Sequence, residues 1–217
     1  MHRRVRLLLA VGLLVGVLLT STGCLFNLFQ TARMLGAGNA ALTVGTGYID
    51  GVLSPQARLA LGLADGLDFG LQSGFLLSLD GGDPIWLGAV GDLKLAIASS
   101  EYFALAAGIG AGYVAEVAGW AALGEVLVEV SPFSPFMYVS PVDDPRKPEY
   151  VLWRPTPTVF ANYQPLVPFA EDSPGVAHHF AGGVVFPVGK SARVLIQVDY
   201  GSLGGLLSYG VAIEITF

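Results

Sequence analysis

Within the last twelve residues, LLSYGVAIEITF at positions 206–217, two kinds of side chain alternate strictly from Leu207 onward. Large apolar residues occupy every second position from Leu207 to Phe217, and small or polar residues such as Glu214 lie between them. A period of two is typical of a β-strand, because successive side chains point to opposite faces. A strand of about 9–11 residues with one apolar face has the length needed to cross a bilayer at a tilt.

A final alternating strand that ends on an aromatic residue resembles the C-terminal strand of bacterial outer-membrane β-barrel proteins. The resemblance implies an all-β fold, a closed antiparallel transmembrane β-barrel. It also implies that Tyr209 and Phe217 belong to a signal that the outer-membrane assembly machinery reads.

The first 23 residues have the parts of a secretory signal. Three arginines and no acid precede an apolar run at positions 7–20. This run of 14 residues forms a signal helix and is shorter than the about 20 residues that a transmembrane helix needs. Small residues then lead to the only cysteine of the chain, so no intramolecular disulfide is possible.

The sequence Ser21-Thr22-Gly23-Cys24 resembles the lipobox of bacterial lipoproteins, although Ser21 stands where an aliphatic residue is usual. The resemblance implies cleavage before Cys24 and a lipid anchor on its sulfur. Because Leu25 rather than Asp follows, it also implies transport to the outer membrane. The alternative is ordinary signal cleavage and a lone buried thiol at Cys24.

The composition beyond the signal is acidic and hydrophobic. Residues 1–23 hold three of the eleven Lys and Arg and none of the seventeen Asp and Glu, so the remainder carries a net charge of −9. This charge argues against nucleic acid as a partner. Although 53% of the chain is hydrophobic, no long apolar run follows residue 20, as expected when apolar residues occupy alternate positions of a barrel wall.

The pattern divides the chain into the signal (1–23), a connector that tethers the lipid to the first strand (24–37) and one barrel domain (38–217). Nine alternating segments are predicted as wall strands: 38–49, 56–64, 67–78, 85–98, 102–114, 120–130, 176–188, 192–200 and 206–217. The stretch 136–175 holds eight prolines, which cannot donate to a ladder. Two strands are conceivable within it, at 136–142 and 158–164.

Parity sets the strand number, because the lipid anchor and the end of the last strand should both be periplasmic. One further wall strand within 136–175 gives ten, with eight and twelve as the alternatives. The rest of that stretch, around 143–175, is then a long extracellular loop. The short turns at 65–66, 99–100, 132–135 and 189–190 fall on the periplasmic side.

The second face of the strands is mostly Gly and Ala with a few charges, which fits a narrow lumen better than the wet face of a soluble lipocalin-type barrel, the alternative fold. The alternation turns nine charged residues inward: Arg58, Asp68, Asp92, Lys94, Glu125, Glu129, Arg193, Asp199 and Glu214. We interpret them as an ion-pair network that closes the lumen. The alternative is an acid-lined pore or carrier of small solutes that favours cations.

Aromatic residues near strand ends are predicted to form girdles at headgroup depth: Tyr48, Trp86, Tyr102, Tyr113, Trp120, Tyr200, Tyr209 and Phe217. His178 and His179 lie near the acidic pairs Asp143-Asp144 and Glu171-Asp172, but no catalytic or metal-ligand spacing joins them. No phosphate-binding loop occurs either. We therefore expect no enzyme activity, cofactor or metal site.

The prediction as a whole is an outer-membrane β-barrel lipoprotein, anchored by its lipid on the periplasmic side. Its expected role is structural or in surface interaction, with the small pore or carrier as the alternative. The expected partners are outer-membrane lipid and the assembly machinery, with an unidentified extracellular partner for the proline-rich loop.

Overall fold

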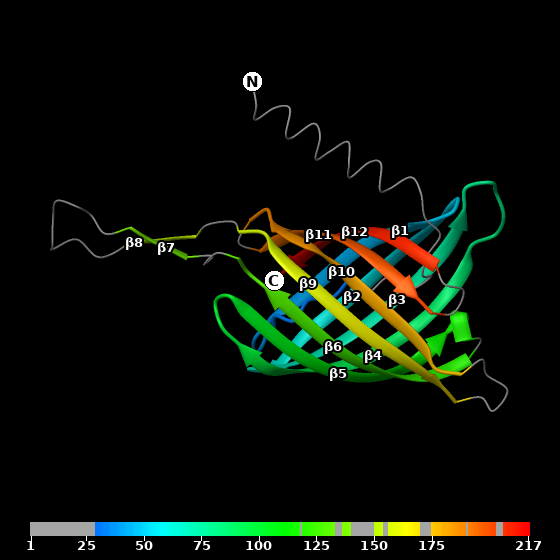
Figure 1. Ribbon diagram of the computed structural model, residues 1–217, viewed down its shortest axis with the longest axis horizontal. Coiled ribbons are helices and arrows are strands. Elements are labelled where there is room, and N and C mark those ends of the chain that lie inside the picture. The colour runs from blue at the N-terminus through cyan, green and yellow to red at the C-terminus, as the bar shows by residue number, and fades with distance from the viewer. Residues whose placement is uncertain are drawn as a thin grey trace, which may run out of the picture.

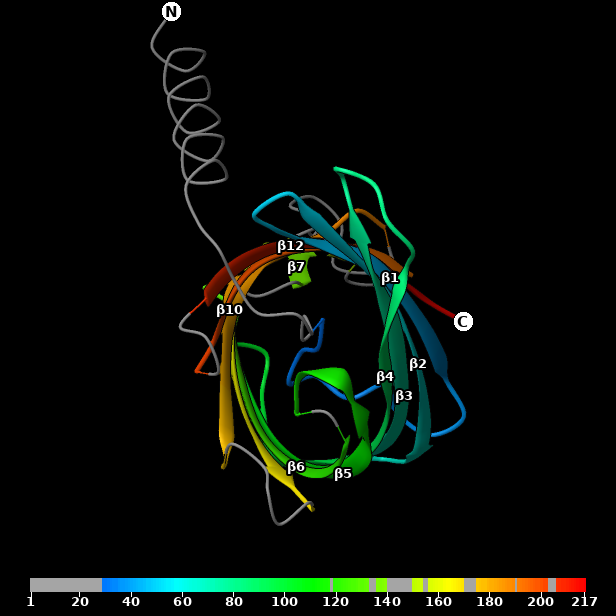
Figure 2. The same cartoon turned by 90° about the vertical axis from the view of Figure 1, so that its right-hand side faces the viewer.

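A computed structural model describes residues 29–117, 119–132, 136–139, 150–153, 156–169, 175–189, 191–202 and 206–217. Ten strands form a closed antiparallel barrel in the order β1-β12-β11-β10-β9-β6-β5-β4-β3-β2, which the two ribbon views show from the side and nearly end-on (Figures 1 and 2). The predicted signal (1–23), Cys24 and residues 25–28 of the connector lie outside the described residues. Within those residues, no helix is long and apolar enough to span a membrane.

The wall strands are β1 (Ala40–Ile49), β2 (Val52–Ala64), β3 (Leu67–Ser78), β4 (Ile85–Ser99), β5 (Phe103–Val114), β6 (Gly119–Val130), β9 (Thr158–Pro168), β10 (Ala177–Pro187), β11 (Ala192–Gly201) and β12 (Leu206–Thr216). Two short strands, β7 (Phe136–Val139) and β8 (Tyr150–Trp153), pair with each other outside the wall. A 3-10 turn, η1 (Ala115–Val117), follows β5.

The first and last wall strands close the barrel. They pair antiparallel over eight residues, from Ala41 opposite Thr216 to Tyr48 opposite Tyr209. The backbone N–H of Phe217 adds a hydrogen bond to the carbonyl of Ala40 at 2.8 Å. No wall strand is left with an unpaired edge in the described chain, and the predicted ten-strand closed barrel is confirmed.

The alternation of the sequence becomes an inside and an outside. On β11, Leu195, Gln197 and Asp199 are buried, whereas the residues between them are more exposed. The same holds around the barrel, and the outer face carries exposed large apolar side chains such as Val44, Leu71, Leu95, Ile109, Val126, Val159, Phe180 and Ile213. A ring of this kind has no polar solvent face, which distinguishes it from a lipocalin-type barrel.

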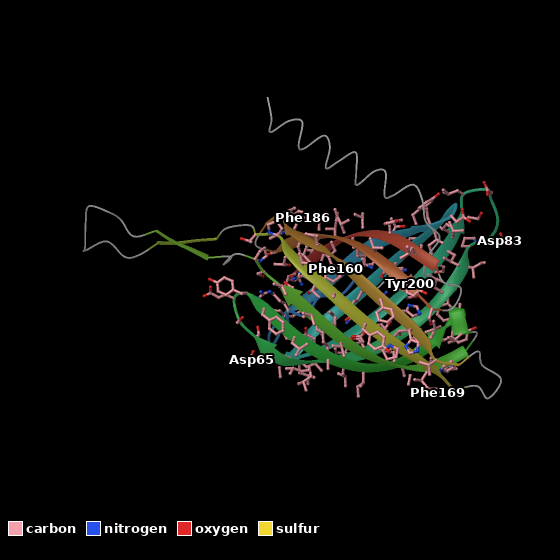
Figure 3. All side chains as sticks on the ribbon, viewed as in Figure 1. Asp65, Asp83, Phe160, Phe169, Phe186 and Tyr200 are labelled. Atoms are coloured by element: carbon pink, nitrogen blue, oxygen red, sulfur yellow. The ribbon has the colours of Figure 1, made fainter. Side chains whose placement is uncertain are left out.

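The two ends of the barrel differ in their connections. At the end where β1 begins and β12 finishes, which we call the terminus end, tight turns at 65–66 and 100–102 join β2 to β3 and β4 to β5. Figure 3 labels Asp65 and Phe186 at this end and Asp83 and Phe169 at the opposite end. The turns predicted at 65–66 and 99–100 therefore share one end, as does the β10–β11 connection around Gly189.

The predicted position of the proline-rich loop was wrong. The wall strand in this stretch is β9, so the residues before it, 131–157 with β7 and β8, are inserted at the terminus end. Figure 1 shows the β7–β8 hairpin extending from that end. The connection at the opposite end, 169–176, is short. The predicted turn at 132–135 does not join two wall strands, because the wall strand after β6 is β9. Residues 133–135 and Lys190 lie outside the described residues.

Proline placement explains why the residues between Val139 and Thr158 add no described strand to the wall. Five prolines lie between Val139 and Thr158, where each would remove a ladder donor. β9 contains only Pro165 and Pro168. Around Pro165 the β6–β9 ladder is interrupted, since Leu123 pairs with Leu166 and the next pair is Val126 with Tyr163.

An apolar layer lies inside the barrel at the opposite end. Its buried residues come from β4, β5, η1, β6, β9 and β10: Leu87, Val90, Val114, Val117, Ala121, Leu123, Leu166 and Ala177. In the end-on view of Figure 2 the short turn after β5 lies within the outline of the ring of strands. The remaining arc of the wall is polar at this end, where Ser54, His179, Asp199 and Ser208 of β2, β10, β11 and β12 are buried.

Most predicted girdle residues are exposed on the wall: Tyr48, Trp86, Tyr102, Trp120, Tyr200 and Phe217. Tyr113 is half-buried and stacks on Trp86 with a centroid distance of 5.5 Å. Tyr209 departs from the prediction. It follows the outward alternation of β12, but only 8% of it is exposed, and its cross-strand neighbours are Tyr48 and Val198.

Gly88 provides a test of this wall geometry. Its φ is +122°, and a Cβ would collide with the backbone carbonyl of Tyr113. We expect Gly88→Ala to lower the free energy of unfolding by about 1–3 kcal/mol, measured as a shift of the urea midpoint in detergent micelles. Gly91→Ala, whose Cβ would meet nothing nearer than 3.8 Å, is the control. Equal midpoints for both variants would contradict this account.

Candidate functional site

The polar lumen is the candidate site, and the chain's own N-terminal segment occupies it. Residues 29–39 precede β1 and contact inward-facing residues of β2, β3, β4, β6 and β12. We call residues 29–37 the plug. Figure 2 shows this start of the described chain inside the ring of strands. The sequence had predicted only a tether over 24–37, whereas residues 29–37 lie in the lumen and contain no helix.

The ring of Phe29 anchors the plug near the middle of the lumen. It is buried with Phe160, Val185, Leu195 and Ala212. Glycines make the room, because a Cβ on Gly210 would lie 2.8 Å from Phe29 Cε1 and one on Gly45 would lie 2.8 Å from Cε2. Gly45 is on β1 and Gly210 is on β12, so the ring bridges the pair of strands that closes the barrel.

Gln30 of the plug binds the carboxylate of Glu125 on β6. Its Nε2 donates to Glu125 Oε1 at 2.9 Å, and Gln164 Nε2 of β9 donates to the same oxygen at 2.7 Å. A small cavity of about 10 Å³ beside Gln30, Asp92 and Glu125 has room for about one water molecule. The other oxygen of Glu125 is buried without a partner, so a water in this cavity would have a hydrogen-bond acceptor available.

Lys94 and Asp68 hold the backbone of the plug. Lys94 Nζ donates to the carbonyls of Thr31 at 3.0 Å and Arg33 at 3.2 Å and lies 3.4 Å from Asp68 Oδ2. Asp68 in turn accepts the backbone N–H of Leu35. A lysine and an aspartate from neighbouring wall strands therefore satisfy both kinds of plug backbone group.

Arg33 fastens the plug at the terminus end. Its Nε pairs with Glu129 Oε1 at 2.9 Å, and Nη2 donates to Ser131 Oγ at 2.9 Å. Both terminal nitrogens also donate to backbone carbonyls of the β4–β5 turn, at Ser100 and Glu101. Arg33 thus ties the plug to two connections of the barrel rim. Beside it, a cavity of about 370 Å³ opens between the plug, Glu129, Thr158 and Arg193.

Other charged residues pair across the wall without the plug. Arg58 of β2 forms a two-bond pair with Asp92 of β4, in which Nη2 and Oδ1 are 2.7 Å apart. The guanidinium crosses β3 over Gly70, where any side chain would occupy its place. Arg193 Nε donates to Glu214 Oε1 at 2.6 Å, and Thr43 donates to the other oxygen of Glu214 at 3.3 Å.

The structure thus places all nine predicted lumen residues inside the barrel, eight of them in two groups. Asp68, Lys94, Glu125 and Glu129 contact the plug, and Arg58, Asp92, Arg193 and Glu214 form two wall pairs. Asp199 accepts from Gln197 Nε2 at 2.9 Å. Sequence reasoning missed Phe29, Gln30 and Arg33. The sequence held a signal for Arg33 alone, the imbalance of six inward acids against three bases, which Arg33 reduces.

The remaining predicted residues do not form a second site in the described chain. His178 points outward and bonds Tyr163 through Nδ1, whereas His179 is buried inward. Asp143, Asp144, Glu171 and Asp172 lie outside the described residues, as does Cys24. Among the described residues, no group of three or more His, Cys, Asp and Glu could hold a metal ion. Phe217, the terminal residue of the predicted assembly signal, is 67% exposed.

Comparisons with known proteins find similarity in structure alone. No protein family and no curated protein sequence matches the chain. Among solved structures, it is similar to the KdgM porin (9% identity, TM-score 0.46, covering 82% of this chain and 99% of that one). It is also similar to the NanC porin, with 10% identity and a TM-score of 0.44 over 80% of this chain and 98% of that one. A third similar structure is the N-terminal barrel domain of Pseudomonas aeruginosa OprF, with 9% identity and a TM-score of 0.37 over 84% of this chain and 99% of that one. These likenesses are distant, so the proposals below rest on this chain's own residues.

The Arg58–Asp92 pair tests the energetics of the lumen. We expect Arg58→Met to lower the free energy of unfolding by about 3–5 kcal/mol, because Asp92 keeps its buried charge without a partner. Arg58→Met combined with Asp92→Asn should recover part of that loss, since neither charge then remains. Urea unfolding in detergent micelles measures both. A double variant as unstable as the single one would show that the uncompensated charge is not the cause.

Proposed function

We propose that this chain is an outer-membrane β-barrel whose lumen is closed by its own N-terminal segment. Three observations support a location in the membrane. The wall strands are 10–15 residues long, enough to span a bilayer at a tilt. Their outer face exposes large apolar side chains around the barrel. The sheet has no open edge in its described part, which hydrocarbon requires because an unpaired backbone group there costs several kcal/mol.

We further propose a structural or interaction role rather than that of a constitutively open pore. The observation that carries this proposal is the plug, which is bonded to Asp68, Lys94, Glu125 and Glu129 and seats Phe29 between β1 and β12. The apolar layer at the opposite end narrows the lumen beyond it. In this proposal the terminus end is periplasmic, and the inserted hairpin of β7 and β8 offers a partner site on that side.

A gated pore is the second candidate function. The wall without the plug contributes six acids and three bases to the lumen, and Arg33 of the plug neutralises Glu129. Withdrawal of the plug would therefore leave an acid-lined passage that favours cations. The apolar layer around Leu87 and Val117 would also have to move for such a passage to conduct.

Planar-bilayer recordings separate the two functions. We expect the wild-type protein to be silent. Phe29→Ala combined with Arg33→Ala removes the ring and the rim anchor of the plug. If the barrel is a gated pore, this variant should give discrete steps that prefer cations and that weaken when Glu125→Gln and Glu129→Gln are added.

Phe69→Ala, which removes an exposed ring from the outer wall, is the control and should remain silent. Heat-modifiable migration on gels shows that each barrel has folded. Open steps from the wild-type protein would contradict closure by the plug. A silent but folded plug variant would eliminate the gated pore and leave the structural role.

We also propose that Cys24 carries a lipid that anchors the mature chain on the periplasmic side of the outer membrane, since the lipobox-like sequence 21–24 supports it. Growth with labelled palmitate should label the wild-type protein, and Cys24→Ala should abolish the label while leaving a folded, heat-modifiable barrel. Labelling that persists in Cys24→Ala would contradict lipidation at this residue.

A further inference from the structure

The outer wall is not uniformly convex. A hollow of about 550 Å³ lies over β6, β9, β10 and β11. Ala161 and Gly182 form its floor, as cross-strand neighbours on β9 and β10. Gly182 leaves its position open, because a Cβ there would meet nothing nearer than 3.8 Å. Two small residues side by side thus interrupt an otherwise bulky surface.

An aromatic row bounds the hollow towards the opposite end, where the pairing aligns Tyr163, Phe180 and Tyr200. The ring centroids of Tyr163 and Phe180 are 4.9 Å apart, and those of Phe180 and Tyr200 are 6.4 Å apart. Figure 3 labels Tyr200 on this part of the wall. Val128 and Val198, the cross-strand neighbours of Ala161 and Gly182, line the two ends of the floor. The hollow is therefore a groove that runs across the strands, with an aromatic row along one side.

The aromatic side of the groove ends in a polar pair. The hydroxyl of Tyr163 lies 2.8 Å from His178 Nδ1, and the two rings stack with centroids 6.0 Å apart. His178 is one residue from the start of β10, so the pair lies near the rim of the barrel. With Nδ1 engaged, Nε2 is the ring nitrogen left for a polar group of a ligand. The groove is thus apolar along its length and polar at the edge nearest the rim.

We propose that this groove binds one phospholipid, with an acyl chain in the hollow and the headgroup beside Tyr163 and His178. The proposal rests on the membrane location proposed above. The volume falls in the range of small-ligand sites, about 300–1,000 Å³, and the aromatic row lies near the rim, where headgroups meet the hydrocarbon. A second copy of the chain is less suited, because only ten residues line the groove, against about 20–30 on each side of a standard protein interface.

Native mass spectrometry of the protein refolded in detergent micelles tests the proposal. Palmitoyl-oleoyl phosphatidylglycerol is added at a limiting ratio, and retained lipid is counted per barrel. We expect one tightly retained lipid on the wild-type protein. Gly182→Leu fills the floor of the groove and should reduce the retained fraction about tenfold, since added volume in a packed site is poorly tolerated.

Gly91→Leu is the matched control. Gly91 also faces outward, on β4, and a Cβ there would likewise meet nothing nearer than 3.8 Å. This variant should keep the wild-type lipid. If Gly182→Leu does not fold, Ala161→Leu fills the same floor from β9, and heat-modifiable migration shows which variants are folded.

Equal lipid retention by the folded groove variant and the Gly91→Leu control would overturn the proposal. A dimer mass that Gly182→Leu abolishes would overturn it as well, because the occupant would then be a second copy. Failure of the wild-type protein to insert into vesicles would instead contradict the proposed membrane location. A folded, inserted barrel that retains no lipid contradicts the groove alone.

Discussion

The pairing of β1 with β12 is the constraint on which the rest of the structure depends. It leaves the ten-strand sheet without an edge and divides every strand into an outer and an inner row of side chains. The outer row has unlimited room, so it carries Leu, Ile, Val and aromatic residues. The inner row converges on a narrow space, so each charged side chain there needs both a partner and a glycine or alanine beside it.

Glycine placement shows how the lumen accommodates its charges. Gly70 lets Arg58 reach Asp92 across an intervening strand, and Gly108 lies against Glu125. Gly45 and Gly210 do the same for an apolar ring, that of Phe29. The plug completes the network, because Glu125, Glu129 and Lys94 face the lumen and take partners from residues 30–33. The segment is therefore a part of the core of the barrel as well as its closure.

The sequence predicted the strand positions and side-chain directions that follow from the two-residue period of a β-strand. The strand at 67–78 was predicted to the residue, and the inward direction of Arg58, Asp92 and Glu125 followed from alternation alone. The plug could not be predicted in this way, since residues 29–37 show neither the two-residue period of a strand nor the 3.6-residue period of a helix. They are held by residues about 30 to 180 positions away in the sequence. The end on which the proline-rich insertion lies depended on whether the first or the second candidate strand joined the wall, and only pairing with β6 and β10 decides that.

The seat of Phe29 has a consequence for the order of events in folding. Half of the seat, Gly45, belongs to the first wall strand, and the other half, Gly210 and Ala212, belongs to the last. The seat does not exist until those strands meet, and once they have met the ring lies within a closed cylinder. The stabilisation that burial of this ring provides is therefore gained only when β1 pairs with β12. Barrel closure and capture of the N-terminal segment are then a single cooperative step.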